Sequence, residues 1–365
     1  MKVSLFIESI ASGGAERQLV GLGNLLKKFN YDVNVVTYYN IPFYAQYLKE
    51  NNIEYVCVPK AANKYTRIFH IFKYFQKNRP DIVISYLDTP NIISIIIRIL
   101  GLRYKLIVSE RNTTQNLSIR ESIKFHLYRY SDKIVPNSSA QTEFILANFP
   151  SLKPKVRLIT NFVDTDYFCP STENKKTKSN LSILVVGRIE KQKNTLRFIE
   201  AIFKVKNKGY EIMVDWYGDK FLKDGMPTEA TKYYLEALIL VNQLGLETNI
   251  KFHDPTINLL DVYQSSDVLC LPSIYEGFPN AICEAMACGK PILAGNIGDN
   301  RILVEPEING FLFDPYSSES MASIIEIFFN LANEHRDKMG MYSREKAIKL
   351  FSKTSFIMKY LELIE

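Results

Sequence analysis

The feature of this sequence that most constrains its fold is a regular alternation of short runs rich in β-branched residues with longer helical stretches. In the first part of the chain the strand-like runs are 3–7, 33–37, 82–85, 106–109 and 133–136. The helical stretches between them are 16–29, 65–78, 92–100, 119–130 and 140–148. Such an alternation favours a parallel sheet that is covered by helices on both faces.

The alternation starts again after a polar stretch, STENKKTKSN at 171–180, which is typical of a linker or surface loop. The second set of strand-like runs is 182–186, 213–217, 250–252, 268–271, 291–294 and 310–313, and its helical stretches are 194–208, 228–244, 258–265, 280–287 and 318–331. A chain of 365 residues is also too long for one ordinary core. We therefore predict an α/β protein of two doubly wound, Rossmann-like domains that face each other across a cleft. The predicted boundaries are 1–168, a linker at 169–180, and 181–351.

The cysteines and histidines predict neither disulfides nor a metal site. The five cysteines form an odd, scattered set without a CxxC pair, and the four histidines are scattered as well. Reduced thiols are typical of a cytoplasmic protein. No apolar run reaches the length of about 20 residues that a membrane span needs, and the N-terminus does not read as a signal peptide. We expect a cytoplasmic location and no cofactor.

Charge is divided unevenly along the chain. Residues 1–168 hold 22 Lys and Arg against 13 Asp and Glu, whereas the remainder holds 23 against 26. A basic half of this kind has three candidate partners, which are an anionic membrane surface, a phosphorylated acceptor and nucleic acid. Because no nucleic-acid-binding module is recognisable, we expect no nucleic-acid partner.

Two stretches of the basic half combine cationic and aromatic residues, namely KYTRIFHIFKYFQKNR at 64–79 and IRESIKFHLYRYSDK at 119–133. A basic amphipathic helix with aromatic residues is typical of binding to a membrane surface. The first stretch fits equally a helix that packs its Phe face on its own sheet and leaves its lysines in water. The hypothesis that follows is a first domain that docks peripherally on anionic lipid at the inner face of the membrane.

The most informative motif is CLPSIYEGFPNAICEAMACGKP at 270–291, which predicts a strand, a loop and a short helix. Proline at the helix start and glycine at its end match the usual asymmetry of helix termini. Glu276 lies in the loop and is predicted to point into the cleft, and Glu284, one turn into the helix, is predicted to bind a ribose. Since a helix N-terminus attracts anions, we predict a cradle for phosphate or sugar oxygens made of Phe278, Pro279, Asn280 and Ala281.

Two further clusters follow predicted strands. VVGRIEKQKN at 185–194 places Arg188 and Lys193 on one loop. Two cations there would stabilise the negative charge that develops on a diphosphate leaving group. SGGAER at 12–17 contains Gly13 and Gly14, which permit close approach of the backbone to a ligand. This cluster is not G-x-G-x-x-G, so a dinucleotide-binding fold is poorly supported.

Together these strings resemble the large retaining glycosyltransferase family four, which has the GT-B fold. The matching elements span nearly the whole chain and are SGGAERQL at 12–19, VVGRIEKQKN at 185–194, SIYEGFPNAICEAMACGKP at 273–291 and EINGFLF at 307–313. The resemblance implies that Gly13 and Gly14 approach the donor phosphates. It implies that Arg188 and Lys193 hold the diphosphate, and that the backbone of residues 278–280 holds sugar and phosphate oxygens.

The resemblance also implies that Glu276 lies near the transferred sugar and that Glu284 binds the ribose. It further implies metal independence, because the cations and the helix end take the place of a metal. The amphipathic segment at the end of the chain, within 352–365, is expected to pack on the first domain. We therefore consider Glu276, Arg188 and Lys193 the catalytic candidates.

The sequence departs from the family pattern at two places. Where many relatives carry a histidine after the fourth strand-like run, this chain reads VSERN at 108–112, so Glu110 and Arg111 become the candidates for the acceptor side. In the run GDNRILVEPE, Ile302 occupies a place where the family often has an acidic residue that contacts the donor. The sequence therefore does not identify the donor sugar.

The function that follows is retaining transfer of a hexosyl group from a nucleotide diphosphate sugar, by family frequency a UDP-sugar. The expected acceptor is lipid-linked or a surface polysaccharide, as in lipopolysaccharide or capsule synthesis. Glu276 would position the sugar rather than attack it, because no second carboxylate is placed as in glycosidases. Glu276→Gln should then lower turnover with little change in nucleotide affinity. The alternatives are a nucleotide-sugar epimerase of the same architecture and a non-catalytic sugar-binding scaffold subunit.

Overall fold

The computed structural model describes residues 1–111, 113–114, 116–172, 180–221 and 231–365, which divide into two compact units. Unit 1 comprises Met1–Phe162 and Lys353–Glu365, and unit 2 comprises Val163–Ser352. The first boundary therefore falls after Phe162 and not at 168. The reason is local, because the side chain of Gln18 hydrogen-bonds both the backbone N–H and the backbone carbonyl of Phe162 and so holds it on unit 1. Most of the predicted linker, residues 173–179, lies outside the described residues.

The described part of unit 1 contains one six-stranded parallel sheet with the strand order β3-β2-β1-β4-β5-β6. Its strands are β1 (Lys2–Phe6), β2 (Asp32–Thr37), β3 (Glu54–Cys57), β4 (Ile82–Tyr86), β5 (Lys105–Glu110) and β6 (Lys133–Pro136). The central strands are buried on both faces, which is why they read as continuous β-branched runs. The sequence did not predict β3, a short edge strand whose side chains are only half-buried.

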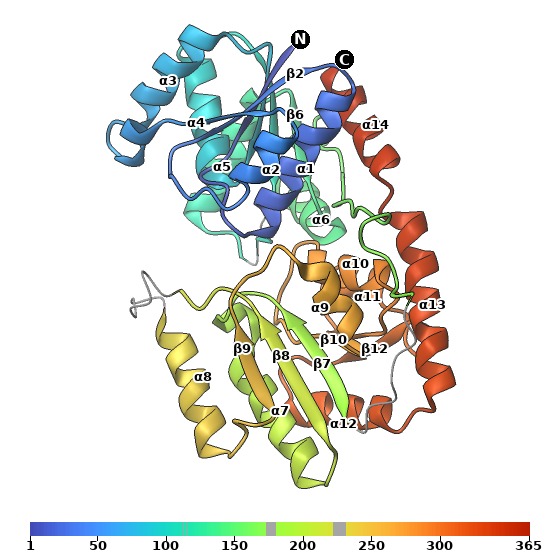
Figure 1. Ribbon diagram of the computed structural model, residues 1–365. Helices are drawn as coiled ribbons and strands as arrows, with labels where there is room; N and C mark the ends of the chain where they lie inside the picture. The colour runs from blue at the N-terminus through green and yellow to red at the C-terminus, as the bar shows by residue number, and fades with distance from the viewer. Residues whose placement is uncertain (112, 115, 173–179, 222–230) are drawn as a thin grey trace. The chain divides into compact units, whose positions relative to one another are not determined.

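Helices cover both faces of this sheet (Figure 1). They are α1 (Gly14–Lys28), α2 (Ala45–Glu50), α3 (Arg67–Asn78), α4 (Asp88–Ile99), α5 (Ile119–Leu127), α6 (Ser139–Asn148) and α14 (Lys353–Ile364). One core joins α1 and the C-terminal helix α14 to one face, and a second core joins α3, α4 and α5 to the other. The side chains of Ser118 and Ser138 cap α5 and α6 by accepting backbone N–H bonds. The chain ends therefore meet in unit 1, where α14 lies beside α1.

Unit 2 repeats the same plan in its described residues, with one six-stranded parallel sheet in the order β12-β11-β10-β7-β8-β9. Its strands are β7 (Leu181–Val186), β8 (Ile212–Tyr217), β9 (Ile250–His253), β10 (Val268–Leu271), β11 (Ile292–Gly295) and β12 (Gly310–Phe313). Its helices are α7 (Thr195–Asn207), α8 (Lys232–Gln243), α9 (Leu259–Ser265), α10 (Asn280–Ala287), α11 (Asn300–Leu303), α12 (Ser318–Phe329) and α13 (Asn333–Leu350). One core joins α7, α8 and α12 to the sheet, and the other joins α9, α10 and α13. The start of the helix predicted at 228–244 lies outside the described residues.

The long helix α13 was not predicted from the sequence. It buries small or polar residues more than large apolar ones, so its sequence shows no apolar periodicity. Gly340 explains how such a helix packs, because a Cβ at this position would lie 2.3 Å from the carbonyl oxygen of Gly289, at the end of α10. Close backbone approach thus replaces the interlocking of large side chains on this face.

Candidate active site

The strand order of each sheet reverses at one point, between β1 and β4 in unit 1 and between β7 and β10 in unit 2. Open parallel sheets bind ligands beyond the carboxyl ends of the strands at this switch point. In unit 2 the two loops that begin there are 187–194, after β7, and 272–279, after β10. The two most specific sequence motifs therefore meet at one place, although they are far apart along the chain.

The two loops are joined by hydrogen bonds. The backbone N–H of Ile274 donates to the carbonyl of Gln192 at 3.0 Å, and the Gln192 side chain donates to the carbonyl of Tyr275 at 2.9 Å. Asn194 has a left-handed backbone (φ 60°), and its side-chain amide donates to the carbonyl of Pro272. These contacts fix the position of the two loops relative to each other. Sequence reasoning had assigned no role to Gln192 and Asn194, because their partners lie about eighty residues away.

Lys193 and Glu276 form an ion pair between these loops, with Nζ and Oε1 at 2.5 Å. Only 15% of the Lys193 side chain and 10% of the Glu276 side chain are exposed. The aliphatic stem of Lys193 lies against Gly187, where a Cβ would be 3.0 Å from Cε. The cation that the sequence predicted for a diphosphate and the carboxylate that it predicted for the sugar thus contact each other directly.

Arg188, the second predicted cation, lies on the same loop and is more exposed. Its guanidinium is 2.9 Å from the carboxylate of Glu190, and 56% of its side chain is accessible. Because more than half of the Arg188 side chain is in water, this ion pair is screened and weaker than an enclosed one. Its predicted role in holding the diphosphate stays a prediction.

Glu284 lies inside unit 2 on α10. Its side chain is buried, and Oε2 accepts a hydrogen bond from the hydroxyl of Tyr263 at 2.9 Å. Tyr263 comes from α9 and was not singled out in the sequence, since nothing in its surroundings marks it. If Glu284 binds a ribose as predicted, Tyr263 is the group that orients its carboxylate.

The predicted cradle lies at the start of α10. Pro279 is the N-cap residue in an extended conformation, no side chain caps this helix, and Asn280 begins it. The ring of Phe278 packs edge-to-face on Phe351, with ring centroids 6.0 Å apart. Residues 278–281 thus form the end of the loop that carries Glu276 and the first residues of α10, at the ligand-binding edge of the sheet.

In unit 1, Gly13 is the N-cap residue of α1 and Gly14 is its first residue, at the switch point of that sheet. The carboxylate of Glu16 folds back over this loop, and a Cβ on Gly13 would be 2.1 Å from its Oε2. Glycine thus gives room to a negatively charged side chain. The approach of this loop to donor phosphates stays a prediction.

Glu110, one of the two acceptor-side candidates, is buried in unit 1. Its side chain has no exposed area, and it contacts Lys124 at 3.0 Å and the hydroxyl of Tyr128. Lys124 also contacts the carboxylates of Asp88 and Glu121. Burial by itself lowers the pKa of Lys124, but Glu110 and Asp88 outweigh that effect and raise it. Glu110 is therefore enclosed among partners of its own unit, and its predicted place on the acceptor side stays a prediction.

Arg111 is buried as well, and its partners come from distant parts of unit 1. It donates to the Tyr86 hydroxyl at 2.7 Å, to the Tyr360 hydroxyl at 2.8 Å and to Asn161 Oδ1 at 2.8 Å. The guanidinium also lies over the Tyr86 ring, 4.1 Å from its centroid. Arg111 thus attaches the C-terminal helix and the segment before the unit boundary to the end of the sheet, and its predicted place on the acceptor side stays a prediction.

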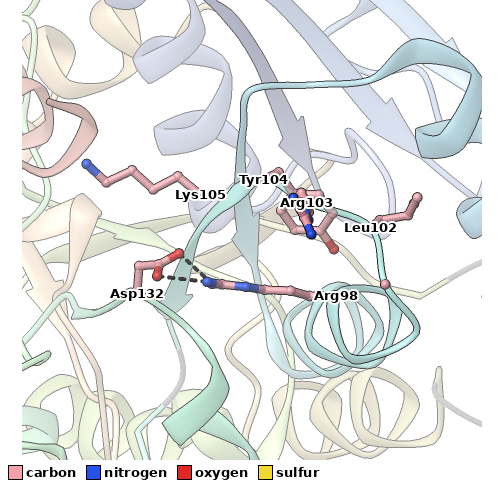
Figure 2. Close-up of a pocket in the computed structure, with 7 residues that line it drawn as sticks. Arg98, Leu102, Arg103, Tyr104, Lys105 and Asp132 are labelled. Atoms are coloured by element: carbon pink, nitrogen blue, oxygen red, sulfur yellow. Dashed lines mark hydrogen bonds and ion pairs between the residues drawn. The ribbon is translucent and has the colours of Figure 1, made fainter.

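A pocket of about 630 Å³ lies in unit 1 at the amino ends of β5 and β6, which is the edge of the sheet opposite to the one that binds ligands in this architecture (Figure 2). Arg98 and Asp132 point toward each other across it in a two-pronged ion pair. Lys105 donates to the carbonyl of Ile364 at the end of α14. Because the one carboxylate of this lining, Asp132, is taken up by Arg98 and the pocket lies at the edge opposite to the ligand-binding one, we do not assign a substrate to it.

Two family models match the chain in succession. Residues 12–167 match the model described as Glycosyltransferase Family 4, and residues 171–346 match the one described as Glycosyl transferases group 1. The chain belongs to glycosyltransferase family four. It is a glycosyltransferase, and the two sheets with this strand order are those of the predicted GT-B fold.

Individual relatives agree with this assignment over most of their length. The glycosyltransferase is 26% identical over 355 residues, 92% of this chain and 91% of the relative, to the Campylobacter jejuni α-1,4-N-acetyl-D-galactosaminyltransferase named for the acceptor GalNAc-α-(1→4)-GalNAc-α-(1→3)-diNAcBac-PP-undecaprenol. It is 25% identical over 312 residues, 80% of each chain, to the N-acetylgalactosamine-N,N'-diacetylbacillosaminyl-diphospho-undecaprenol 4-α-N-acetylgalactosaminyltransferase of the same organism. The crystal structure of Anabaena HepE in complex with UDP-glucose superimposes with a TM-score of 0.84 at 20% identity, covering 99% of this chain and 98% of HepE.

Three further properties of the glycosyltransferase follow from its side chains. No helix among the described residues is long and apolar enough to cross a membrane. Within the same residues, no cluster of three or more His, Cys, Asp or Glu side chains is arranged to hold a metal ion. All five cysteines are free thiols, and burial raises the pKa of Cys288 to about 12, which makes that thiol a poor nucleophile.

Proposed function

We propose that this glycosyltransferase moves a hexosyl group from a UDP-sugar to a saccharide carried on a lipid diphosphate, with retention of the anomeric configuration. The observation that carries the proposal is the Lys193–Glu276 pair at the switch point of unit 2, where a cation and a carboxylate are held together by two interlocked loops. The printed names of the two Campylobacter relatives, both of which contain a diphospho-undecaprenol acceptor, support the lipid carrier. The complex of HepE with UDP-glucose supports a UDP-sugar donor.

The residues divide the chemistry between them. The bond from the anomeric carbon to the diphosphate oxygen breaks, and Lys193 and Arg188 stabilise the charge that develops on the leaving diphosphate. The acceptor hydroxyl oxygen bonds to the anomeric carbon on the same face of the sugar, and its proton passes to the diphosphate. Glu276 accepts hydrogen bonds from the sugar hydroxyls and thereby positions the ring. Glu284, oriented by Tyr263, accepts hydrogen bonds from the ribose, and no metal is needed.

A nucleotide-binding experiment tests the donor. Trp216 is the single tryptophan of the chain and is buried in unit 2, so its fluorescence during thermal unfolding reports on that unit. A ligand that binds only the folded state raises the unfolding temperature. We expect UDP to raise it, and GDP and ADP to leave it unchanged. A shift with GDP or ADP alone would replace the proposed donor, and no shift with any of the three would favour a non-catalytic scaffold.

Turnover with a synthetic lipid-diphosphate saccharide tests the reaction. Donor and acceptor together should give a lengthened lipid-linked glycan and free UDP. Isomerisation of the sugar nucleotide when it is incubated alone would instead favour an epimerase. Transfer to a free oligosaccharide at the same rate as to the lipid-linked one would remove the lipid carrier from the proposal.

We also propose that unit 1 docks on an anionic membrane through α5 and the residues around it. In α3, Ile71 and Phe75 are buried and Phe72 packs against the core, so most of its apolar face is used internally. In α5, Phe125 is buried in the same core, but two isoleucines of its outer side remain in water, since 83% of Ile119 and 57% of Ile123 are exposed. Exposed arginines flank these two isoleucines, and they are Arg120 and Arg129. Apolar side chains ringed by cations, in the basic half of the chain, suit a surface of anionic lipid.

Flotation with liposomes tests this second part. We expect the protein to float with vesicles that contain anionic lipid and to remain in solution with vesicles of neutral lipid. The double substitution Ile119→Ser and Ile123→Ser should abolish flotation, whereas Phe69→Ser on α3, which removes one exposed aromatic residue, should leave most of it. Equal losses from both changes would move the docking surface away from α5, and binding that ignores lipid charge would overturn it.

A further inference from the structure

The Lys193–Glu276 pair has a consequence for how nucleotide leaves the site, and this consequence rests on the proposed function. We propose that Glu276 and the diphosphate of the nucleotide compete for Lys193, so that the pair weakens the hold on free UDP and promotes release of this product. Glu276 would then have a second role besides positioning the sugar.

The first support is that the pair is preset. The two loops that carry it are joined by the Ile274–Gln192 and Gln192–Tyr275 hydrogen bonds described above. Asn194, next to Lys193, donates to two carbonyls, those of Pro272 and Pro315. The loops therefore cannot separate easily, and the carboxylate stays within reach of the ammonium group whichever ligand is present.

The second support is shielding. Both side chains are largely out of water, and the stem of Lys193 lies flat on Gly187. Water and salt screen a partly buried pair less than a surface pair, so the attraction between Lys193 and Glu276 is worth more than that of an ordinary surface ion pair. A diphosphate that takes Lys193 must overcome this attraction.

The third support concerns what each ligand offers to Glu276. A sugar nucleotide brings hydroxyl groups that can donate hydrogen bonds to the carboxylate when the diphosphate draws Lys193 away. Free UDP brings the same diphosphate but none of the hydroxyls of the transferred sugar, so its anionic oxygens lie near a carboxylate that has lost its partner. Like charges at short distance are costly in a shielded site. The pair therefore opposes the product more strongly than the donor.

The proposal changes one expectation from the sequence, namely that Glu276→Gln leaves nucleotide affinity unaltered. Measured by titration calorimetry, Glu276→Gln should lower the Kd for UDP about three- to tenfold, because the neutral amide no longer holds Lys193 against the diphosphate. Lys193→Met should raise the Kd about tenfold or more, through loss of a cation that the diphosphate uses. The decisive measurement is the double variant, in which Glu276→Gln should no longer tighten UDP because Lys193 is absent.

Glu326→Gln is the matched control, since it also breaks a lysine–carboxylate pair in unit 2, with Lys208, but at the far end of α12. It should leave the Kd for UDP unchanged.

Four outcomes count against the proposal. If Lys193→Met weakens UDP but Glu276→Gln does not tighten it, competition is wrong and the proposed donor site stands. If Glu276→Gln tightens UDP binding equally with and without Lys193, the effect comes only from removing a negative charge near the anionic ligand, and competition is again wrong. If Lys193→Met binds UDP as tightly as the unmodified protein does, Lys193 is not part of the donor site. If neither protein binds UDP, the proposed donor is wrong. In both cases the proposed competition is wrong as well.

Discussion

The two sheets of this glycosyltransferase have the same strand order, but the charged residues at the carboxyl ends of their strands are arranged differently. In unit 2 the charged groups at the switch point, Lys193 and Glu276, keep some contact with solvent and join only two loops. In unit 1 the charged groups beside the ends of β4 and β5 are buried among internal partners, with Glu110 fully enclosed against Lys124. One topology thus carries a partly exposed ion pair in one unit and an enclosed charge network in the other.

This difference explains why the two halves of the sequence are unequally informative. A loop that meets a small, charged ligand needs particular residues at particular spacings, and such loops are recognisable in a single sequence. A buried network needs only that its members meet in space, and they come from separate helices and strands. Arg111, which joins Tyr86, Asn161 and Tyr360, has no sequence spacing that would reveal it.

The largest expected effect tests the enclosed charge network of unit 1, in which Lys124 contacts Glu110. Lys124→Met leaves the carboxylate of Glu110 buried without its cation and beside Asp88, and breaking a buried pair in this way costs about 3–5 kcal/mol. Denaturant unfolding followed by far-UV circular dichroism should show this loss, whereas the fluorescence of Trp216 in unit 2 should keep its midpoint. Lys77→Met on α3 removes an exposed lysine and serves as control. An unchanged stability would mean that Glu110 is not enclosed as described.

The next effect tests the proposed role of the partly exposed pair of unit 2, Lys193 and Glu276. Glu276→Gln should lower turnover about 10²- to 10³-fold, because a neutral amide positions the sugar hydroxyls less firmly in the transition state. The variant should lose about 1 kcal/mol of stability with the ion pair and remain folded under assay conditions, as denaturant unfolding would show, which separates catalysis from folding. Full activity would remove Glu276 from the site and with it the contrast between the two units.

A smaller effect concerns the attachment of the C-terminal helix. Tyr360→Phe removes the hydroxyl that contacts both Arg111 and Tyr86, and the loss of hydrogen bonds to a buried cation costs about 1–2 kcal/mol. Hydrogen exchange should become faster in α14, while α10 in unit 2 should be unaffected. Tyr65→Phe, at an exposed tyrosine of unit 1, is the matched control. Equal exchange in both variants would show that α14 is held by its apolar contacts alone.

The smallest effect depends on pH. Burial tends to raise the pKa of Asp132, but the guanidinium of Arg98 and the backbone N–H of Leu106 outweigh burial and lower it. A lowered pKa in the folded state gives stability that is present at neutral pH and is lost as pH falls through the folded-state pKa. Asp132→Asn should therefore cost about 1 kcal/mol at neutral pH, since the carboxylate is partly exposed. The difference from the unmodified protein should close in acid, and a difference that stays constant with pH would contradict the lowered pKa.

The sequence by itself determined the α/β class, most of the strands and helices, the family and the two charged loops of unit 2. It could do so because periodicity, glycine and proline positions, and charged residues after strands are local signals. The tertiary structure decided which of the charged residues meet. It placed Lys193 on Glu276, added Gln192, Asn194 and Tyr263 as supports, and enclosed Glu110 and Arg111. It also decided the packing of α13. This helix makes contact through small residues such as Gly340, and such contacts leave no hydrophobic periodicity in the sequence. The reason is the same in each case, because the partners are far apart along the chain and are brought together only when the sheets form.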